Sequence, residues 1–199
     1  GRNFVAIHPR NTLKVPTSNQ SNRIVESSKL MAIRACFFGD SFVNGVGDNQ
    51  HLGWVGHLSA AESSRGADLT SYNLGIRRDT SGDVAARRQN EAVLRLRQED
   101  EQLLVFSFGV NDAVIEQGQI RLEPAQTLLN ISEILGAATQ RAPCIFNGPP
   151  PVADQELNDR VAALSAGIRI QCMEMDVTFF DPFPALIKSS IWMDGVIAG

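Results

Sequence analysis

A run of apolar and aromatic residues that ends abruptly in Gly39-Asp40-Ser41 constrains this chain more than any other feature. Residues 33–38 read as a strand buried on both faces, because most of their side chains are apolar. A tight turn with a serine then leaves the strand end, where open α/β sheets place ligands and catalytic groups. Taken alone, the three residues also fit a loop serine that caps a helix, so two later stretches decide between these interpretations.

The two later stretches repeat the arrangement of a strand-like run followed by glycine and polar residues. They are 72–76 (Tyr-Asn-Leu-Gly-Ile) and 106–112 (Phe-Ser-Phe-Gly-Val-Asn-Asp). In order and spacing, the three blocks resemble the first three blocks of the GDSL family of serine esterases and lipases, also called SGNH hydrolases. The resemblance extends from about Ile33 to the C-terminus, and three blocks in order are far more specific than any one alone.

Strand-like runs alternate with helical patterns along the chain. We expect strands and helices over the following ranges: strands at 32–38, 69–74, 102–108, 144–147 and 177–180, and helices at about 54–64, from Thr80 or Ser81, at 124–141 and from Asp154. Such alternation predicts a parallel sheet covered on both faces by right-handed crossovers. The expected fold is therefore α/β, a flavodoxin-like three-layer α/β/α domain around a five-stranded parallel sheet. No helix is expected after the last strand.

One domain over residues 31–199 is expected, and residues 1–30 are interpreted as an N-terminal extension or a vector-derived segment. The formal net charge of −4 gives no electrostatic reason to expect nucleic acid or an anionic membrane as a partner. No apolar run is long enough for a transmembrane segment, and no secretory signal is visible. The cysteines at 36, 144 and 172 are expected to be reduced and buried, which favours a cytoplasmic location.

Ester hydrolysis needs a nucleophile, a base and donors for the oxyanion, and the three blocks offer two of these. Ser41 is the expected nucleophile, and its own N–H can point at the oxyanion. Gly75 has no side chain, so its N–H can approach the same oxygen, and Asn111 can add a side-chain amide donor. The resemblance implies these same roles for the three positions. By itself, Asn111 would also fit an Asx turn at a strand end.

Three further residues are candidates for contacting the substrate. Trp54 follows a glycine-rich loop, which reads either as a flexible connection or as a wall of the acyl or alcohol pocket. Arg77 either pairs with a nearby acidic residue or binds a carboxylate or phosphate of the substrate. Asn44 follows Ser41 closely and is a candidate to support the site.

The residue that would activate the serine is missing from its expected place. In the family, an Asp-x-x-His pair near the C-terminus supplies the histidine base and the aspartate that orients it. The histidines of this chain are at 8, 51 and 57, and none lies in such a block. Either residues 194–198 form a degenerate block, with Ile197 where the histidine belongs, or the chain stops before the block. The second explanation is favoured.

The sequence thus predicts a hydrolase that cleaves a small-molecule carboxylic ester through an acyl-enzyme on Ser41. The alternative is a catalytically inactive binding domain of the same fold that lacks the histidine base. No cluster of residues has metal-ligand spacing, so neither a metal nor a cofactor is expected. The acyl chain and the oligomeric state have no signature in the sequence.

Overall fold

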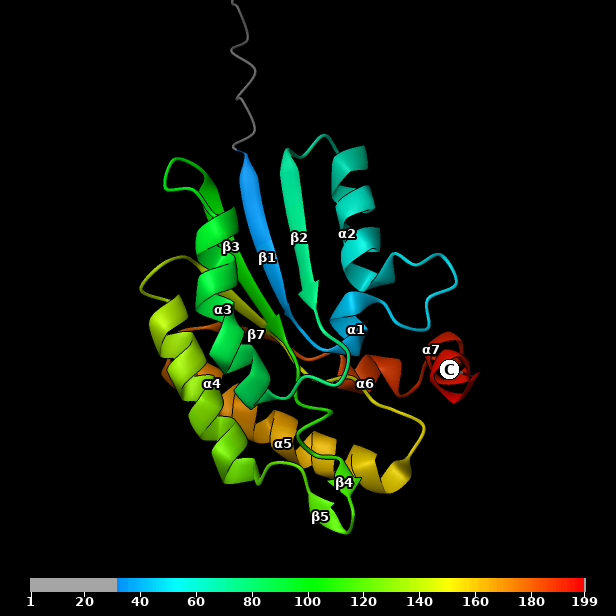
Figure 1. Ribbon diagram of the computed structural model, residues 1–199. Coiled ribbons are helices and arrows are strands. Elements are labelled where there is room, and N and C mark those ends of the chain that lie inside the picture. The colour runs from blue at the N-terminus through cyan, green and yellow to red at the C-terminus, as the bar shows by residue number, and fades with distance from the viewer. Residues whose placement is uncertain (1–31, 199) are drawn as a thin grey trace, which may run out of the picture.

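The computed structural model describes residues 32–198, so the expected extension at 1–30, with His8, lies outside the described residues. Its centre is a five-stranded parallel sheet in the order β2-β1-β3-β6-β7 (Figure 1). The strands are β1 (Ile33–Gly39), β2 (Leu69–Gly75), β3 (Glu101–Ser107), β6 (Cys144–Asn147) and β7 (Thr178–Phe180). The predicted five-stranded parallel sheet is confirmed, and the strand ends differ only slightly from those expected.

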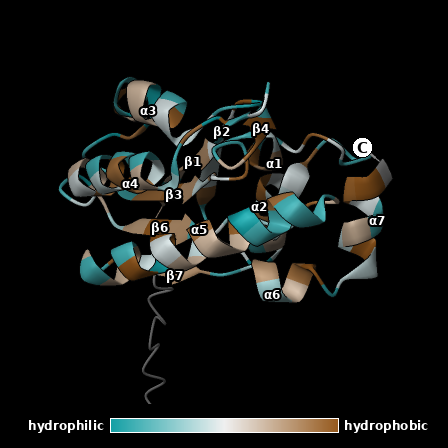
Figure 2. Cartoon of the chain, turned by 90° about the horizontal axis from the view of Figure 1, so that it is seen from below, coloured by the Kyte–Doolittle hydropathy of each residue, from teal (hydrophilic) through white to brown (hydrophobic). Residues whose placement is uncertain are grey.

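Helices cover both faces of this sheet. They are α1 (Ser41–Asn44), α2 (Gly53–Ser64), α3 (Ser81–Arg95), α4 (Pro124–Ala138) and α5 (Gln155–Glu174). Side chains that alternate along β1 belong to two separate hydrophobic clusters. Cys36 and Phe38 pack with α3, α4 and α5, whereas Ala35 and Phe37 pack with α1 and α2. The domain therefore has the three layers predicted from the sequence (Figure 2).

Local sequence signals determine where the helices begin. Thr80 caps α3 in a reciprocal capping box with Asp83, and Asp154 caps α5 by accepting the N–H of Leu157 at 2.8 Å. Pro124 lies in the first turn of α4, where its missing N–H costs nothing. These starts agree with the prediction, and the start of α3 places Ser81 above the end of the sheet that carries the candidate residues.

Two parts of the chain differ from the expectation. A two-stranded hairpin, β4 (Ile115–Glu116) and β5 (Gln119–Ile120), lies between β3 and α4. Its turn residues Gln117 and Gly118 both have positive φ, which suits a tight hairpin. The expectation of no helix after the last strand is wrong, because α6 (Phe183–Leu186) and α7 (Ser190–Ala198) follow it.

The register of the sheet brings three strand ends together. Gly39 lies opposite Gly75 of β2 and opposite Ser107 of β3. A Cβ on Gly39 would lie 2.0 Å from the carbonyl oxygen of Ser107, so only glycine fits there. The three sequence blocks therefore meet at one edge of the sheet, where their polar residues leave the strands.

The three cysteines are buried free thiols, as expected. Burial raises the pKa of Cys36 and Cys144 to about 11 and that of Cys172 to about 12, so none is a ready nucleophile. Between residues 32 and 198, no helix combines the length and the apolar character that crossing a bilayer requires.

Candidate active site

Ser41 is the first residue of α1, directly after the turn that ends β1. The preceding Asp40 is the N-cap of this short helix, and its carboxylate accepts the N–H of Phe42 at 2.9 Å. The Ser41 side chain is half-buried, and its hydroxyl makes no hydrogen bond within residues 32–198. The cap therefore fixes the backbone around the serine and leaves its hydroxyl available.

Gly75 is pressed against the backbone of α1. A Cβ at this position would lie 2.2 Å from the amide nitrogen of Asn44 and 2.7 Å from the carbonyl oxygen of Asp40. The side chain of Asn44 donates to the carbonyl oxygen of Gly75 at 3.1 Å. However, the N–H of Gly75 donates to the side-chain oxygen of Asn73 at 3.0 Å, so this expected oxyanion donor already has a partner.

Asn111 follows β3 and connects the three blocks. Its side-chain amide donates to the carbonyl oxygen of Asp79 at 3.0 Å and lies 3.4 Å from the carboxylate of Asp40. Asp79 belongs to the turn after β2, and Asp40 to the turn after β1. One amide thus joins the turns after β1 and β2 to the end of β3, in the crevice where the sequence predicted the site.

The floor of this crevice carries buried carboxylates. The pKa of Asp40 is raised to about 7, chiefly by burial; the bond from Phe42 lowers it, and the charges of Asp112 and Asp79 add to the rise. Burial also raises the pKa of Asp112, although its carboxylate accepts the N–H of Ser81 and the hydroxyl of Thr127, each at 3.1 Å. Asp112 thereby ties the start of α3 to α4 beneath Asn111.

Arg87 of α3 is a structural residue of the site that the sequence did not single out. It donates to the carboxylate of Asp79 at 2.7 Å and to the carbonyl oxygen of Gly39 at 3.1 Å. This arginine therefore clamps the turn after β2 to the end of β1. The sequence signal was weak, because Arg87 is one of several charged residues on a helix.

The remaining substrate-binding candidates lie in different surroundings. Asn44 is exposed on α1, next to Ser41 in the fold. Trp54 packs edge-on against Phe37, with ring centroids 5.5 Å apart, and belongs to the cluster beneath α2. Its ring thus has a packing role on one face of the sheet. Arg77 is exposed in the turn after Gly75 and makes no hydrogen bond or ion pair within the described residues.

Among the described residues, neither His51 nor His57 makes a hydrogen bond to Ser41. His57 on α2 lies 3.3 Å from the carboxylate of Asp48, and His51 is exposed in the preceding loop. Asp194 and Ile197, the positions of the degenerate block, lie on α7, where Ile197 is 68% exposed. Residues 32–198 hold no group of three or more His, Cys, Asp or Glu that could bind a metal ion.

Trp192 of α7 packs beside the serine and was not among the expected site residues. Its ring stacks on that of Phe42, with centroids 5.7 Å apart, and its Nε1–H donates to the carbonyl oxygen of Pro151 at 2.9 Å. Phe42 follows Ser41 directly, so α7 covers the residue next to the candidate nucleophile. In the sequence, the only sign of this contact was the presence of Trp192 close to the C-terminus.

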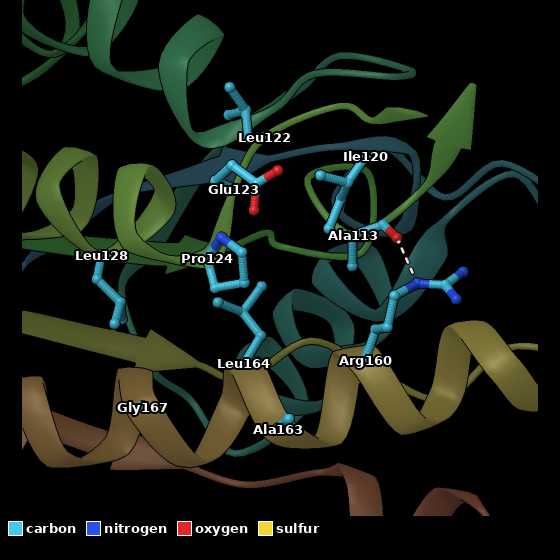
Figure 3. A pocket seen from close by; sticks show the side chains of 10 residues that line it. All are labelled: Ala113, Ile120, Leu122, Glu123, Pro124, Leu128, Arg160, Ala163, Leu164 and Gly167. Carbon is cyan, nitrogen blue, oxygen red and sulfur yellow. Dashed lines mark hydrogen bonds between the residues drawn. The ribbon is translucent and has the colours of Figure 1, made fainter. Parts of the chain in front are cut away.

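An apolar pocket of about 350 Å³ lies next to this region, between α4, α5 and the β4–β5 hairpin. Figure 3 shows Arg160 reaching from α5 to the carbonyl oxygen of Ala113, at 2.9 Å, along one side of it. Neither Ser41, Gly75 nor Asn111 lines this pocket. It is therefore separate from the crevice at the strand ends.

Solved structures similar to this chain include esterases and lipolytic proteins. The esterase AlinE4, described as an SGNH-hydrolase family esterase, is 22% identical over 81% of this chain and 82% of its own, with a TM-score of 0.65. The lipase/acylhydrolase from Enterococcus faecalis is 17% identical over 82% of this chain and 85% of its own, with a TM-score of 0.67. The psychrotrophic esterase EstA from Pseudoalteromonas is 16% identical over 82% and 86%, with a TM-score of 0.62. These likenesses identify an SGNH hydrolase fold.

The sequence itself identifies the family. The model of the GDSL-like lipase/acylhydrolase family matches residues 37–198, which is most of the chain. The chain therefore belongs to the GDSL-like lipase/acylhydrolase family, and the resemblance inferred from the three blocks is confirmed. No curated protein sequence is significantly similar to this chain.

Proposed function

We propose that this protein hydrolyses a small-molecule carboxylic ester through an acyl-enzyme on Ser41. The serine oxygen attacks the carbonyl carbon and gives its proton to a base, and the ester C–O bond breaks as the alcohol leaves with a proton. Water then attacks the acyl-enzyme, releases the acid and restores the serine. Family membership and the esterase fold support this hydrolase chemistry.

The observation that carries the proposal is the meeting of Ser41 and Asn111 around Asp40. Ser41 follows Asp40 in the chain, and the Asn111 amide lies 3.4 Å from the Asp40 carboxylate. In the proposed reaction the Asn111 amide stabilises the oxyanion. The N–H of Gly75 is a second donor, and it serves only after the Asn73 side chain has swung away from it.

A binding domain without catalysis is the second candidate, and two observations favour it. The amide groups of Gly75 and Asn111 already donate within the protein, to Asn73 and Asp79. Within residues 32–198, His57 is paired with Asp48 of the loop between α1 and α2 and not with Ser41. A serine without its base loses most of its rate, so this candidate predicts ligand binding with little turnover.

Labelling by a fluorophosphonate separates the two candidates, with the full-length protein as the sample. Stoichiometric labelling on the tryptic peptide that contains Ser41, together with hydrolysis of 4-nitrophenyl acetate and butyrate, supports the esterase. The Ser41→Ala variant is the control and must lose both signals. A folded protein that is neither labelled nor active on either ester overturns the esterase proposal and leaves the binding domain.

We further propose a cytoplasmic location. Three buried thiols without disulfide partners are typical of a reducing compartment. Fractionation of the native cells tests this proposal, and recovery of the protein in the extracellular fraction would contradict it.

A further inference from the structure

The turn that follows β2 is fastened to the candidate site. The N–H of Ile76 donates to the carbonyl oxygen of Gly39 at 3.0 Å, and the N–H of Asp79 donates back to Ile76 at 3.2 Å. The carbonyl oxygen of Asp79 accepts the amide of Asn111 at 3.0 Å. These bonds hold the four residues from Ile76 to Asp79 against the ends of β1 and β3.

The third residue of this turn, Arg78, has a backbone conformation that favours glycine. Its φ is +72°, in the left-handed region that bulky side chains rarely adopt. Contacts from outside the turn hold it there: its guanidinium pairs with Glu116 of the hairpin, and Arg121 donates to its carbonyl oxygen at 3.1 Å. Residues held in this region by their surroundings are enriched at functional sites. The turn is thus a rigid platform.

Arg77 is the second residue of the same turn, and its charge has no direct partner among residues 32–198. The other cations of this region do have partners. Arg87 pairs with Asp79 at 2.7 Å, whereas Arg78 and Arg121 share the carboxylate of Glu116. The guanidinium of Arg77 is therefore exposed and available, two residues after Gly75 and on a backbone that is held in place.

We propose that Arg77 binds an anionic group of the substrate, so that the site favours esters whose acyl or alcohol part carries a carboxylate or a phosphate. A guanidinium binds both groups through two parallel N–H donors, which also orients them. The inference rests on the ester hydrolysis proposed above and names the substrate class of that site.

Matched pairs of esters test the proposal in the full-length protein. The carboxylate pair is mono-4-nitrophenyl glutarate and its methyl ester, and the phosphate pair is butanoyl glycerol phosphate and butanoyl glycerol. Arg77→Gln is expected to lower the charged-to-neutral ratio of kcat/KM by about two- to fivefold for one pair, which is the usual range for an exposed ion pair. Arg77→Lys should restore part of the ratio. The pair that responds identifies the anionic group.

The matched control is Arg97→Gln, which removes the same charge from an exposed residue just after α3, before β3 begins. It should leave both ratios unchanged. The proposal is overturned if Arg77→Gln changes the charged-to-neutral ratio for neither pair. It is also overturned if Arg97→Gln lowers the ratio as much as Arg77→Gln does.

A binding measurement keeps the inference separate from the proposed reaction. Calorimetry on the Ser41→Ala variant compares unreactive amides: N-butyl glutaramate against its methyl ester, and phosphorylated against unphosphorylated N-butanoylethanolamine. Tighter binding of a charged amide by about two- to fivefold, lost when Arg77→Gln is added, supports the anionic subsite even where no ester is cleaved. Equal binding of charged and neutral amides overturns it, whatever the esterase assay gives.

Discussion

The side-chain amide of Asn111 lies 3.4 Å from the carboxylate of Asp40, although 71 residues separate the two in the chain. The same amide donates to the carbonyl oxygen of Asp79 at 3.0 Å, so it is oriented by oxygens from two turns. The bond to Asp79 holds the amide in place, and the proton directed at Asp40, over the longer distance of 3.4 Å, is the one that an oxyanion would accept. This arrangement makes Asn111 the first residue to test.

Asn111→Ala is expected to lower kcat for aryl esters by about 10²–10³-fold, the usual effect of removing one oxyanion donor. Asn130→Ala is the matched control, because the amide of Asn130, on α4, donates to the hydroxyl of Ser81 at the start of α3 at 2.8 Å and is not an expected oxyanion donor. The control should lose some stability and keep kcat. Equal kcat values in the two variants would exclude Asn111 as an oxyanion donor.

Asp40 is expected to make stability depend on pH. Its pKa of about 7 in the folded protein exceeds the 3.8 of an ordinary aspartate, so the folded state binds the proton more tightly than the unfolded state. Raising the pH from about 4 to about 7 therefore destabilises the fold, and the cost is complete above pH 7. Removing the charge should cancel a penalty on the order of a few kcal/mol.

The variant Asp40→Asn should consequently melt at a higher temperature than the wild type at pH 8, by about 5 °C or more, and the difference should be clearly smaller at pH 5. Thermal unfolding followed by circular dichroism at both pH values measures this. The exposed Asp159→Asn on α5 is the matched control. A loss of stability in Asp40→Asn that is equal at the two pH values would contradict the expectation.

The close packing of Gly75 against α1 predicts a loss of stability when this glycine is replaced. Gly75→Ala would put a Cβ within 2.2 Å of the Asn44 amide nitrogen, so α1 must shift, at a cost of about 1–3 kcal/mol. Gly136→Ala on α4 is the control, since its Cβ would meet only Met175, at 3.8 Å, and it should gain about 0.5–1 kcal/mol. Chemical denaturation measures both. A Gly75→Ala protein as stable as the wild type would show that α1 can move away from residue 75 at no measurable cost in free energy.

The position of the crevice could be predicted because the signals that define it are local. Ser41 and Asn111 each follow a buried strand, and parallel strands bring their carboxyl ends to one edge whatever the connections do. The direction of a single N–H could not be predicted in this way. The N–H of Gly75 points to Asn73, because a side chain two residues earlier folds back onto it, and this depends on one rotamer.

Long-range packing explains the other differences. Trp54 was compatible with a pocket wall, yet the sheet offers Phe37 as a packing partner, and burying an aromatic ring is favourable. The helix α7 was missed because its own apolar pattern is weak, with Ile191 89% exposed. Its position depends on contacts made by Trp192 with residues far away in sequence, which no local pattern encodes.

Trp192 is expected to anchor α7 over the residue next to the serine. Trp192→Ala removes the stack on Phe42 and the hydrogen bond to Pro151, so amide hydrogen exchange in α7 should accelerate strongly. Trp192→Phe keeps the stack and loses only the hydrogen bond, which is worth about 1 kcal/mol, so its exchange should be intermediate. Hydrogen–deuterium exchange read by mass spectrometry on the peptide containing residues 190–198 measures both.

The matched control for this experiment is Trp54→Ala, which removes a ring of the same kind from a different cluster, the one that contains Phe37. Because Trp54 packs on Phe37 beneath α2, the substitution should lower global stability by about 2–4 kcal/mol and leave the order of exchange in α7 unchanged under native conditions. Exchange in α7 that is equally fast in the wild type and in Trp192→Ala would mean that the stack on Phe42 does not hold this helix, and that the surroundings of Ser41 are open on that side.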